Sequence, residues 1–309
     1  AHGIDLGLAT ATRAPAKGDP KVEQSARSRL GQVCLPVLSP GRTAMLFVSR
    51  PGLVQHLGPP EDQLADRTLT IRTALHHLTA MPEAALAQGL SAPAEHFAMD
   101  AFEAAGLTRI AELRYLQRPL AQRSGPLPAP GSAIDPPRGR SWPGGANVHA
   151  YASADACPKA DALMRSAIEA SYAQTLDCPA LRSLRSMDDV IDSHRQTGAW
   201  TPGLWWHAEI HGRQIGCLLL NPSPVEDAVE LVYMGLAPSA RGLGLGSAML
   251  QRGIELCERL GHAWLRCAVD LNNEPAARLY ERSGFVPTSS RIAHAVSVLG
   301  TPAAENEAS

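Results

Sequence analysis

The run Glu230-Leu-Val-Tyr-Met-Gly-Leu-Ala-Pro-Ser-Ala-Arg-Gly-Leu-Gly-Leu-Gly-Ser247 joins a predicted strand, Ala228 to Leu236, to a predicted helix from about Leu245 to Leu260. The turn between them contains three alternate glycines, Gly242, Gly244 and Gly246. Because glycine has no β-carbon, backbone N–H groups in such a turn can converge on an anion. The helix N-terminus adds unpaired donors and partial positive charge. The run therefore predicts a pyrophosphate site, to which Arg241 adds a full positive charge.

Other glycine-rich turns fit this run less well. A P-loop requires Gly-Lys-Ser/Thr at its end, whereas this turn ends in Leu245-Gly246-Ser247. A dinucleotide-binding fold fits Gly242-Leu-Gly244 and the acid Asp270 at the end of the next strand. However, Ser247 takes the place of its third glycine, and positions 271 to 309 are too few for the remaining strand-helix units. A purely structural turn stays open as an alternative.

A second motif follows downstream: Asn273-Glu-Pro-Ala276-Ala-Arg-Leu279-Tyr280-Glu-Arg-Ser-Gly284-Phe285. Together with Arg241-Gly-Leu-Gly-Leu-Gly246, it resembles the GNAT superfamily, whose phosphate loop is Arg/Gln-x-x-Gly-x-Gly/Ala and whose later segment is N-x-x-A-x-x-L-Y-x-x-x-G-F. The resemblance covers roughly Val148 to Leu299. It implies an acetyl-CoA-dependent N-acetyltransferase, in which an amine attacks the thioester directly in a ternary complex.

The resemblance also implies a set of cofactor-binding residues. Backbone groups of the strand would bind pantetheine and, through one N–H, the thioester oxygen as it gains charge. The glycine turn would hold the pyrophosphate, and an asparagine before the last helix would either cap that helix or bind the cofactor. The expected residues are Met234, Gly235, Leu236, Arg241, Gly242, Leu243, Gly244, Leu245, Gly246, Ser247 and Asn273.

Two side chains are the expected catalytic groups. Tyr280 has the family position for protonating the departing thiolate, and its alternative is a packing residue. Glu230 is the expected base for the incoming ammonium, because period two places it on the same strand face as Val232 and Met234. His207 is a competing base. The Asp177-Cys178-Pro179 segment lies where the family borders its acceptor site, and a plain turn is its alternative.

The two halves of the chain repeat each other weakly. If Gly106 is set against Gly284, an offset of 178, Leu86 to Leu107 overlays Trp264 to Phe285, and Phe102 falls on Tyr280. The same offset sets the glycine turn against Gln63 to Thr68, which has no glycine. The first half is therefore expected to be a degenerate copy that binds no coenzyme A.

These patterns predict an α/β fold of the α+β type, with two GNAT-like domains that each have a mixed, mainly antiparallel sheet flanked by helices. The expected domains are residues 1–120 and 148–309, joined by a proline-rich linker at 121–147. Strands are expected near Leu6 and at Gln32–Leu38, Thr43–Val48, Leu204–Ile210, Gln214–Leu220, Ala263–Val269 and Ile292–Val298. Helices are expected at Gln63–Met81, Lys159–Tyr172, Met187–Arg195 and Glu274–Ser283.

Composition limits the remaining possibilities. The formal net charge is −2, with charges of both signs interspersed, which argues against a nucleic-acid partner. No apolar run is long enough to span a membrane, so a cytoplasmic protein is expected. Six cysteines without a C-x-x-C pair indicate reduced thiols and no metal site. The expected acceptor is a small-molecule or peptide amine; the alternative is a non-catalytic acyl-CoA-binding or partner-binding module. The sequence gives no oligomeric state.

Overall fold

The chain folds into two compact units. The computed structural model describes residues 10–13, 30–50, 60–121, 141–151 and 159–299. Unit 1 comprises residues 1–111, 183–185 and 291–309, and unit 2 comprises residues 112–182 and 186–290. The boundaries fall inside two long strands, β5 (Thr108–Pro119) and β11 (Val286–Ser297). The units therefore do not follow the division into 1–120 and 148–309, because the end of β11 belongs to unit 1. Most of the expected linker lies outside the described residues.

Unit 1 contains a five-stranded sheet in the order β1-β2-β3-β4-β11. Among the strands that the structure describes in this unit, only β3 and β4 pair in parallel. The core packs two helices on the sheet, with Ile71, Ala101 and Phe102 fully buried or nearly so. The elements of this unit, besides the parts of β5 and β11, are β1 (Thr10–Arg13), β2 (Leu30–Ser39), β3 (Thr43–Val48), α1 (Pro60–Leu78), β4 (Leu86–Ser91) and α2 (His96–Ala104).

Unit 2 contains a six-stranded sheet in the order β5-β10-β9-β8-β7-β6, in which only β9 and β10 pair in parallel. Its elements are β6 (Asn147–Ala150), α3 (Ala160–Tyr172), α4 (Met187–Gln196), β7 (Trp205–Ile210), β8 (Arg213–Pro222), β9 (Ala228–Leu236), α5 (Leu245–Arg259), β10 (Trp264–Asp270) and α6 (Glu274–Arg282). The sheets of both units confirm the predicted mixed, mainly antiparallel α/β fold.

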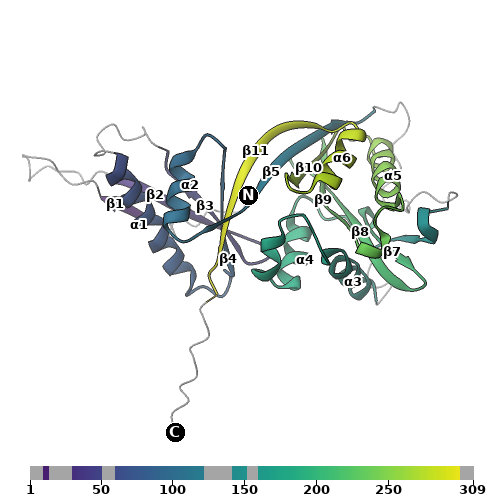
Figure 1. Ribbon diagram of the computed structural model, residues 1–309, viewed down its shortest axis with the longest axis horizontal. Coiled ribbons are helices and arrows are strands. Elements are labelled where there is room, and N and C mark those ends of the chain that lie inside the picture. The colour runs from purple at the N-terminus through teal and green to yellow at the C-terminus, as the bar shows by residue number, and fades with distance from the viewer. Residues whose placement is uncertain (1–9, 14–29, 51–59, 122–140, 152–158, 300–309) are drawn as a thin grey trace, which may run out of the picture. The chain divides into compact units, whose positions relative to one another are not determined.

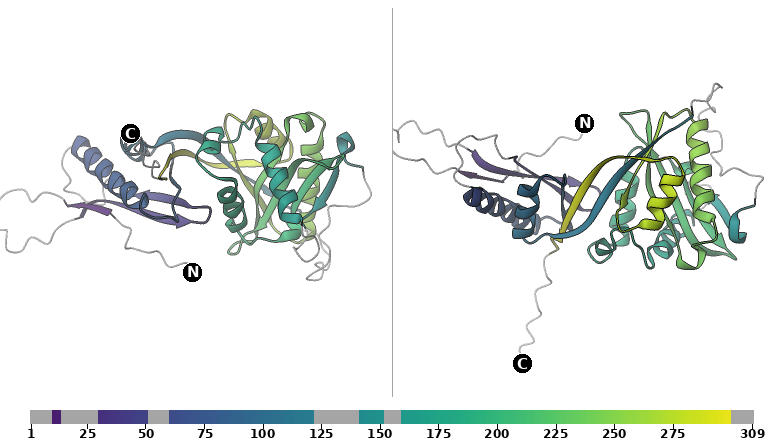
Figure 2. Two further views of the ribbon diagram at one scale, coloured as in Figure 1. Left: turned by 90° about the horizontal axis from the view of Figure 1, so that it is seen from below. Right: turned by 45° about the horizontal axis from the view of Figure 1, so that its top comes forward.

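Helices cover both faces of the unit 2 sheet (Figure 1). One core cluster contains Met249 and Ile254 of α5, Tyr280 of α6, and Leu218 and Leu220 of β8. Met164 and Ile168 of α3 and Ile191 of α4 belong to a second cluster, which includes Cys217 and Leu219 on the opposite face of β8. Alternate residues of one strand thus supply two cores, and α5 and α6 lie side by side on one of them (Figure 2).

A buried polar residue fixes α4 to this sheet. Asn221 of β8 is fully buried. Its amide nitrogen donates to the carbonyls of His194 (2.8 Å) and Thr197 (2.5 Å), and its oxygen accepts from Trp205 Nε1 (2.8 Å). Because a buried amide is costly unless it is hydrogen-bonded, Asn221 specifies where α4 ends.

A β-bulge in β9 overturns one predicted face. Leu219 pairs with Tyr233 and Leu220 with Leu231, so Val232 is the extra residue. The bulge changes the phase of the strand. Glu230, which pairs with Asn221, therefore lies on the face opposite to Met234, whose side chain joins the α5 core. The prediction that Glu230 and Met234 share a face was wrong because strict period-two alternation does not hold across a bulge.

The offset of 178 between the halves holds only from β4 onward. It carries α2 onto α6 and β5 onto β11, residue for residue. Gly106 and Gly284 both have positive φ, at 101° and 81°. Upstream, however, α1 begins at Pro60 and continues to Leu78, so the segment Gln63 to Thr68 is helix and not the counterpart of the glycine turn. Residues 51–59, which precede α1, lie outside the described part of the chain.

The remaining predicted helices and strands are found within a few residues of their expected ends. The strands show the differences: β11 already begins at Val286, and β1, β5 and β6 were not among the expected strands. The strand near Leu6 lies outside the described residues. No helix in the described part of the chain is long and apolar enough to cross a membrane. The five cysteines in the described ranges are thiols and not disulfides.

Candidate functional site

The site is built where β9 and β10 part. Within the described ranges the two strands pair only at Trp264–Arg266 against Ala228–Glu230. Beyond Glu230, β9 continues to Leu236 beside β8 alone. Ala237 N–H bonds the Ile215 carbonyl of β8 (2.7 Å). Because successive strand residues direct their backbone groups to opposite edges, Met234 and Leu236 direct theirs away from β8, to the unpaired edge.

The glycine turn follows directly from this edge. Gly242 and Gly244 have φ of 76° and 80°, a region that favours glycine. A β-carbon at Gly242 would meet no atom within 4 Å, so the turn is open above. Gly244 is the N-cap of α5, whose first-turn N–H groups have no acceptor within the helix. The predicted turn geometry is therefore present, with donors available for an anion.

Arg241 differs from its predicted use. Its guanidinium donates to four backbone carbonyls: Leu236 at the end of β9 (2.9 Å), and Ser171, Ala173 and Gln174 at the end of α3 (3.4, 2.7 and 3.0 Å). Favourable positive charge at a helix C-terminus explains this arrangement. The side chain ties the turn to α3, and only its overall charge acts on an anion at the turn.

Tyr280 is buried on α6 with 6% of its surface exposed. Its ring lies 5.4 Å from that of Phe285. Burial raises the pKa of the Tyr280 phenol well above 10, and the charges of Cys267, Asp177 and Tyr233 raise it further. The hydroxyl therefore stays protonated at neutral pH, as a proton donor must.

Glu230 lies in the last paired step between β9 and β10, opposite Arg266. It is half-buried. Burial raises the pKa of its carboxyl, Arg266 lowers it, and Glu226 raises it. The pKa of this carboxyl is thus closer to neutral pH than that of an exposed glutamate, which suits a proton acceptor.

The carboxylates of Asp177 and Asp270 accept backbone N–H groups that link the loop after α3 to the end of β10. The Asp177 carboxylate accepts from Asp270 N–H (3.3 Å), and the Asp270 carboxylate accepts from Cys178 N–H (3.2 Å) and Asn272 N–H (2.9 Å). Asp270 is buried. This reciprocal pair ties the loop after α3 to the end of β10. It brings Asp177 into the site, although its sequence neighbourhood equally suited a plain turn.

Aromatic side chains line the face of β9 that carries α3 and α4. Tyr233 stacks on Tyr172 and on His194, each at 5.4 Å, and its hydroxyl lies 2.9 Å from Ser171 Oγ. A β-carbon at Gly235 would lie 2.5 Å from the Tyr233 hydroxyl. Gly235 is therefore required for this packing.

Two predicted side chains have structural bonds. Asn273 is the N-cap of α6 and its oxygen accepts from Ala276 N–H (3.3 Å). His207 lies on β7, which β8 separates from β9. It bonds Gln214 (2.8 Å) and stacks on His149, and burial lowers its pKa. The structure does not bring His207 to the parting strands.

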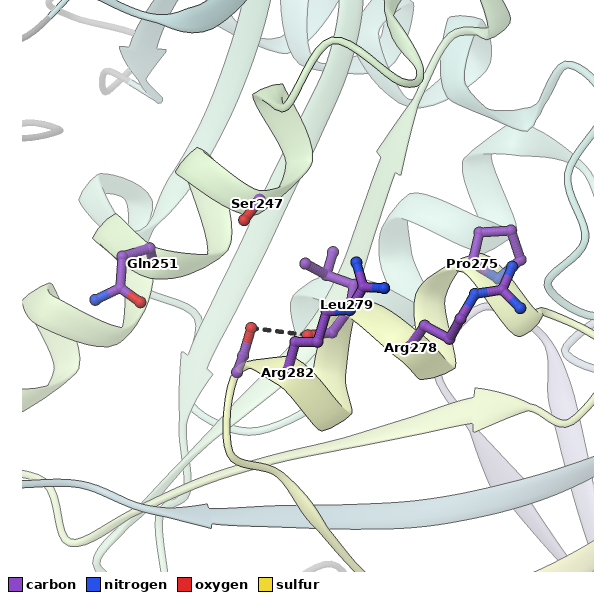
Figure 3. A pocket seen from close by; sticks show the side chains of 7 residues that line it. Ser247, Gln251, Pro275, Arg278, Leu279 and Arg282 are labelled. Carbon is purple, nitrogen blue, oxygen red and sulfur yellow. Dashed lines mark hydrogen bonds between the residues drawn. The ribbon is translucent and has the colours of Figure 1, made fainter.

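A cavity of about 400 Å³ lies between α5 and α6. Figure 3 shows Ser247 and Gln251 on α5 and Arg278, Leu279 and Arg282 on α6. Arg278 pairs with Glu274 (2.7 Å). Ser247, at the start of α5, joins this cavity to the glycine turn. No cluster of three or more His, Cys, Asp or Glu side chains suited to a metal occurs among the described residues.

A sequence profile of the Acetyltransferase (GNAT) family matches residues 168–285. This segment is a GNAT acetyltransferase domain. It contains the parting strands, the glycine turn and Tyr280, and it falls within unit 2 apart from residues 183–185.

Named relatives of the chain are acetyltransferases. A mycothiol acetyltransferase of Streptomyces avermitilis is 30% identical over 213 residues, which are 69% of this chain and 61% of the relative. A mycothiol acetyltransferase of Streptomyces coelicolor is 29% identical, over 65% of this chain and 57% of the relative. The chain thus spans about three fifths of these relatives' length. A solved GCN5-related N-acetyltransferase of Sphaerobacter thermophilus has a TM-score of 0.54 at 16% identity, covering 88% of this chain and 78% of that one, and shares the fold.

Sequence reasoning named Asp177 and Asp270 separately and missed their pairing, and it missed the arginines of the α5–α6 cavity. The Asp177–Asp270 pair joins positions far apart in the chain, and no motif links them. The sequence did contain a signal for the arginines of the α5–α6 cavity. Arg278 and Arg282 are four residues apart in a predicted helix, which places them on one helix face.

Proposed function

We propose that unit 2 transfers the acetyl group of acetyl-CoA to an amine. The parting of β9 from β10 beside the glycine turn carries this proposal, because it combines a free strand edge, an anion cradle and a buried phenol within one domain. Acetyl-CoA supplies the acetyl thioester. The turn from Gly242 to Ser247 would hold its pyrophosphate, and the edge at Met234 and Leu236 would hold its pantetheine by backbone hydrogen bonds.

The α5–α6 cavity suits the nucleotide end of the same molecule. It opens next to Ser247, and Arg278 and Arg282 add positive charge to its wall. Phosphate groups bind well to arginine, because the guanidinium donates two parallel hydrogen bonds. We assign the phosphorylated adenosine to this cavity.

The proton transfers are assigned to the half-buried Glu230 and the buried Tyr280. Glu230, with its raised pKa, takes a proton from the acceptor ammonium, directly or through water. The Tyr280 hydroxyl gives a proton to the sulfur as it leaves. The free N–H at the unpaired edge of β9 stabilises the oxyanion between these steps.

The acceptor is proposed to be a small-molecule amine related to mycothiol, since the relatives carry that name. Unit 1 is proposed to be a second, degenerate copy of the same fold that shapes the protein without binding coenzyme A. Its helix α2 has Phe102 where α6 has Tyr280.

The test is release of coenzyme A from acetyl-CoA, followed by chromatography, with deacetylated mycothiol, glucosamine, spermidine and ethylamine. We expect turnover with at least one amine, and the largest kcat/KM with deacetylated mycothiol. Binding of acetyl-CoA without turnover of any amine would instead support a non-catalytic acyl-CoA-binding module.

A further inference from the structure

The Asp177 carboxyl lies at the end of β10, past the last residue at which β10 pairs with β9. Its oxygen accepts the Asp270 N–H, and β10 pairs with β9 only as far as Arg266. The loop that carries Asp177 is held from both sides: Arg241 bonds the carbonyls of Ala173 and Gln174, and Asp270 bonds the Cys178 N–H. The carboxyl is thus positioned by contacts that leave one of its oxygens outside this hydrogen bond.

The surroundings of Asp177 are negative or neutral. Among the described residues it forms no ion pair with Lys, Arg or His, and Arg241 is committed to backbone carbonyls. The titratable groups whose charges interact with that of Asp177 are Asp270 and Cys267 of β10, Tyr233 of β9, Tyr280 of α6 and the neighbouring Cys178. Burial raises the pKa of Asp177, the Asp270 N–H lowers it, and the Asp270 charge raises it. A half-buried carboxylate of this kind lacks a counter-ion, and a cation beside it would be favourable.

An amine acceptor reaches the site mostly as an ammonium ion at neutral pH. We propose that Asp177 binds this ammonium and so selects acceptors that arrive as cations. This inference rests on the proposed acetyl transfer. Asp177 holds the ammonium at the end of β10, next to Tyr280, until Glu230 takes its proton. The loss of that proton removes the attraction and frees the amine to attack.

The test compares two acceptors of the same size and different charge. Ethylamine is a cation at pH 7.5, whereas methoxyamine, which has oxygen in place of a methylene, is neutral. Asp177→Asn keeps an oxygen for the Asp270 N–H and removes the charge. We expect kcat/KM for ethylamine to fall roughly 10- to 100-fold, mainly through KM, as for a lost hydrogen bond to a charged group. For methoxyamine, corrected for its uncatalysed reaction, we expect less than about a threefold change.

The control is Asp192→Asn, which removes an exposed carboxylate of α4 and should change neither acceptor. A thermal shift with acetyl-CoA reports whether each variant still binds the donor. An equal fall for both acceptors would reduce Asp177 to a structural residue, and no fall for ethylamine would also overturn the inference. Failure of the wild-type protein to acetylate ethylamine while it acetylates another amine contradicts charge selection. Failure with every amine contradicts the proposed function instead.

Discussion

The segment from β3 to β5 and the segment from β9 to β11 have the same order of elements and a similar parallel step. In each, the parallel strands pair over three residues: Thr43–Met45 with Leu86–Gln88, and Ala228–Glu230 with Trp264–Arg266. In each, the residue after the helix-ending glycine bonds back to the aromatic residue, Leu107 to Phe102 and Phe285 to Tyr280.

The chemistry of the two segments differs at the aromatic residue. Phe102 is packed so closely on β4 that a β-carbon at Gly89 would lie 2.5 Å from its ring. At the offset of 178, Gly89 of β4 corresponds to Cys267 of β10, and Phe102 of α2 corresponds to Tyr280 of α6. The same backbone thus serves a closed apolar core in one half and a buried proton donor in the other. The two segments thus share a backbone arrangement and differ in their chemistry. A substitution in one half should therefore change the properties of that half and leave those of the other unchanged.

The largest expected effect comes from the glycine turn. Gly244→Glu adds a side chain at φ 80° and a negative charge where the pyrophosphate would lie. We expect affinity for acetyl-CoA to fall by more than about 100-fold, as two lost contacts of 1.4 kcal/mol each would give, measured by titration calorimetry. Ala65→Glu, an exposed acid on α1 of unit 1, is the matched control and should leave affinity unchanged. Undiminished binding in Gly244→Glu would place the donor elsewhere.

Tyr280→Phe removes the hydroxyl oxygen by which Tyr280 of unit 2 differs from its counterpart Phe102 in unit 1. We expect kcat to fall roughly 10²- to 10⁴-fold, the usual contribution of a general acid. The melting temperature shift with acetyl-CoA should persist, because the ring stays in its core. Wild-type turnover in this variant would make Tyr280 a packing residue like Phe102.

The pH dependence of the activity should follow the ionisation of the Glu230 carboxyl. Its folded pKa is raised, so the carboxyl becomes protonated, and inactive as a base, as pH falls through that raised value. Activity should therefore decline on the acid side at a higher pH than for an ordinary glutamate. Glu230→Gln should lower kcat by about 10²-fold and remove this limb. Because the pKa of Tyr280 is raised well above 10, no alkaline loss from the phenol is expected near neutral pH. An unchanged profile in Glu230→Gln would assign the base to another group.

The smallest effect concerns stability in unit 1. Gly89→Ala places a methyl group against the Phe102 ring, and overpacking of this kind costs about 1–3 kcal/mol. We expect a lower urea midpoint for the unfolding of unit 1 and unchanged affinity for acetyl-CoA. A simultaneous loss of affinity would show that unit 1 takes part in donor binding.

Much of this arrangement could be predicted from the sequence because it depends on local signals. The glycine turn, the strand before it and the helix after it are encoded in consecutive residues, and so is the Asn273 cap of α6. The repeat offset also located α2 from α6, because the overlay of Leu86–Leu107 on Trp264–Phe285 includes both helices.

The predictions that were wrong concern features that depend on residues far apart in the chain. The bulge at Val232 is set by pairing with β8, so no period within β9 could show it, and the face of Glu230 followed from it. The continuation of β11 into unit 1, where it pairs with β4, has no local signal. The Arg241 side chain could bind phosphate by its chemistry alone. Only the fold shows that its guanidinium donates to backbone carbonyls at the end of α3 instead. The longer α1 changed the offset upstream of β4 without altering any motif.

The central claim is that one half of this protein binds the donor and the other does not. Calorimetric titration of acetyl-CoA into the full chain tests it most directly. The full chain is the right sample because β11 contributes to unit 1, so residues 1–120 alone lack part of that sheet. The account predicts close to one site per chain, lost in Gly244→Glu. Two sites of similar affinity, or one site that survives Gly244→Glu, would contradict it.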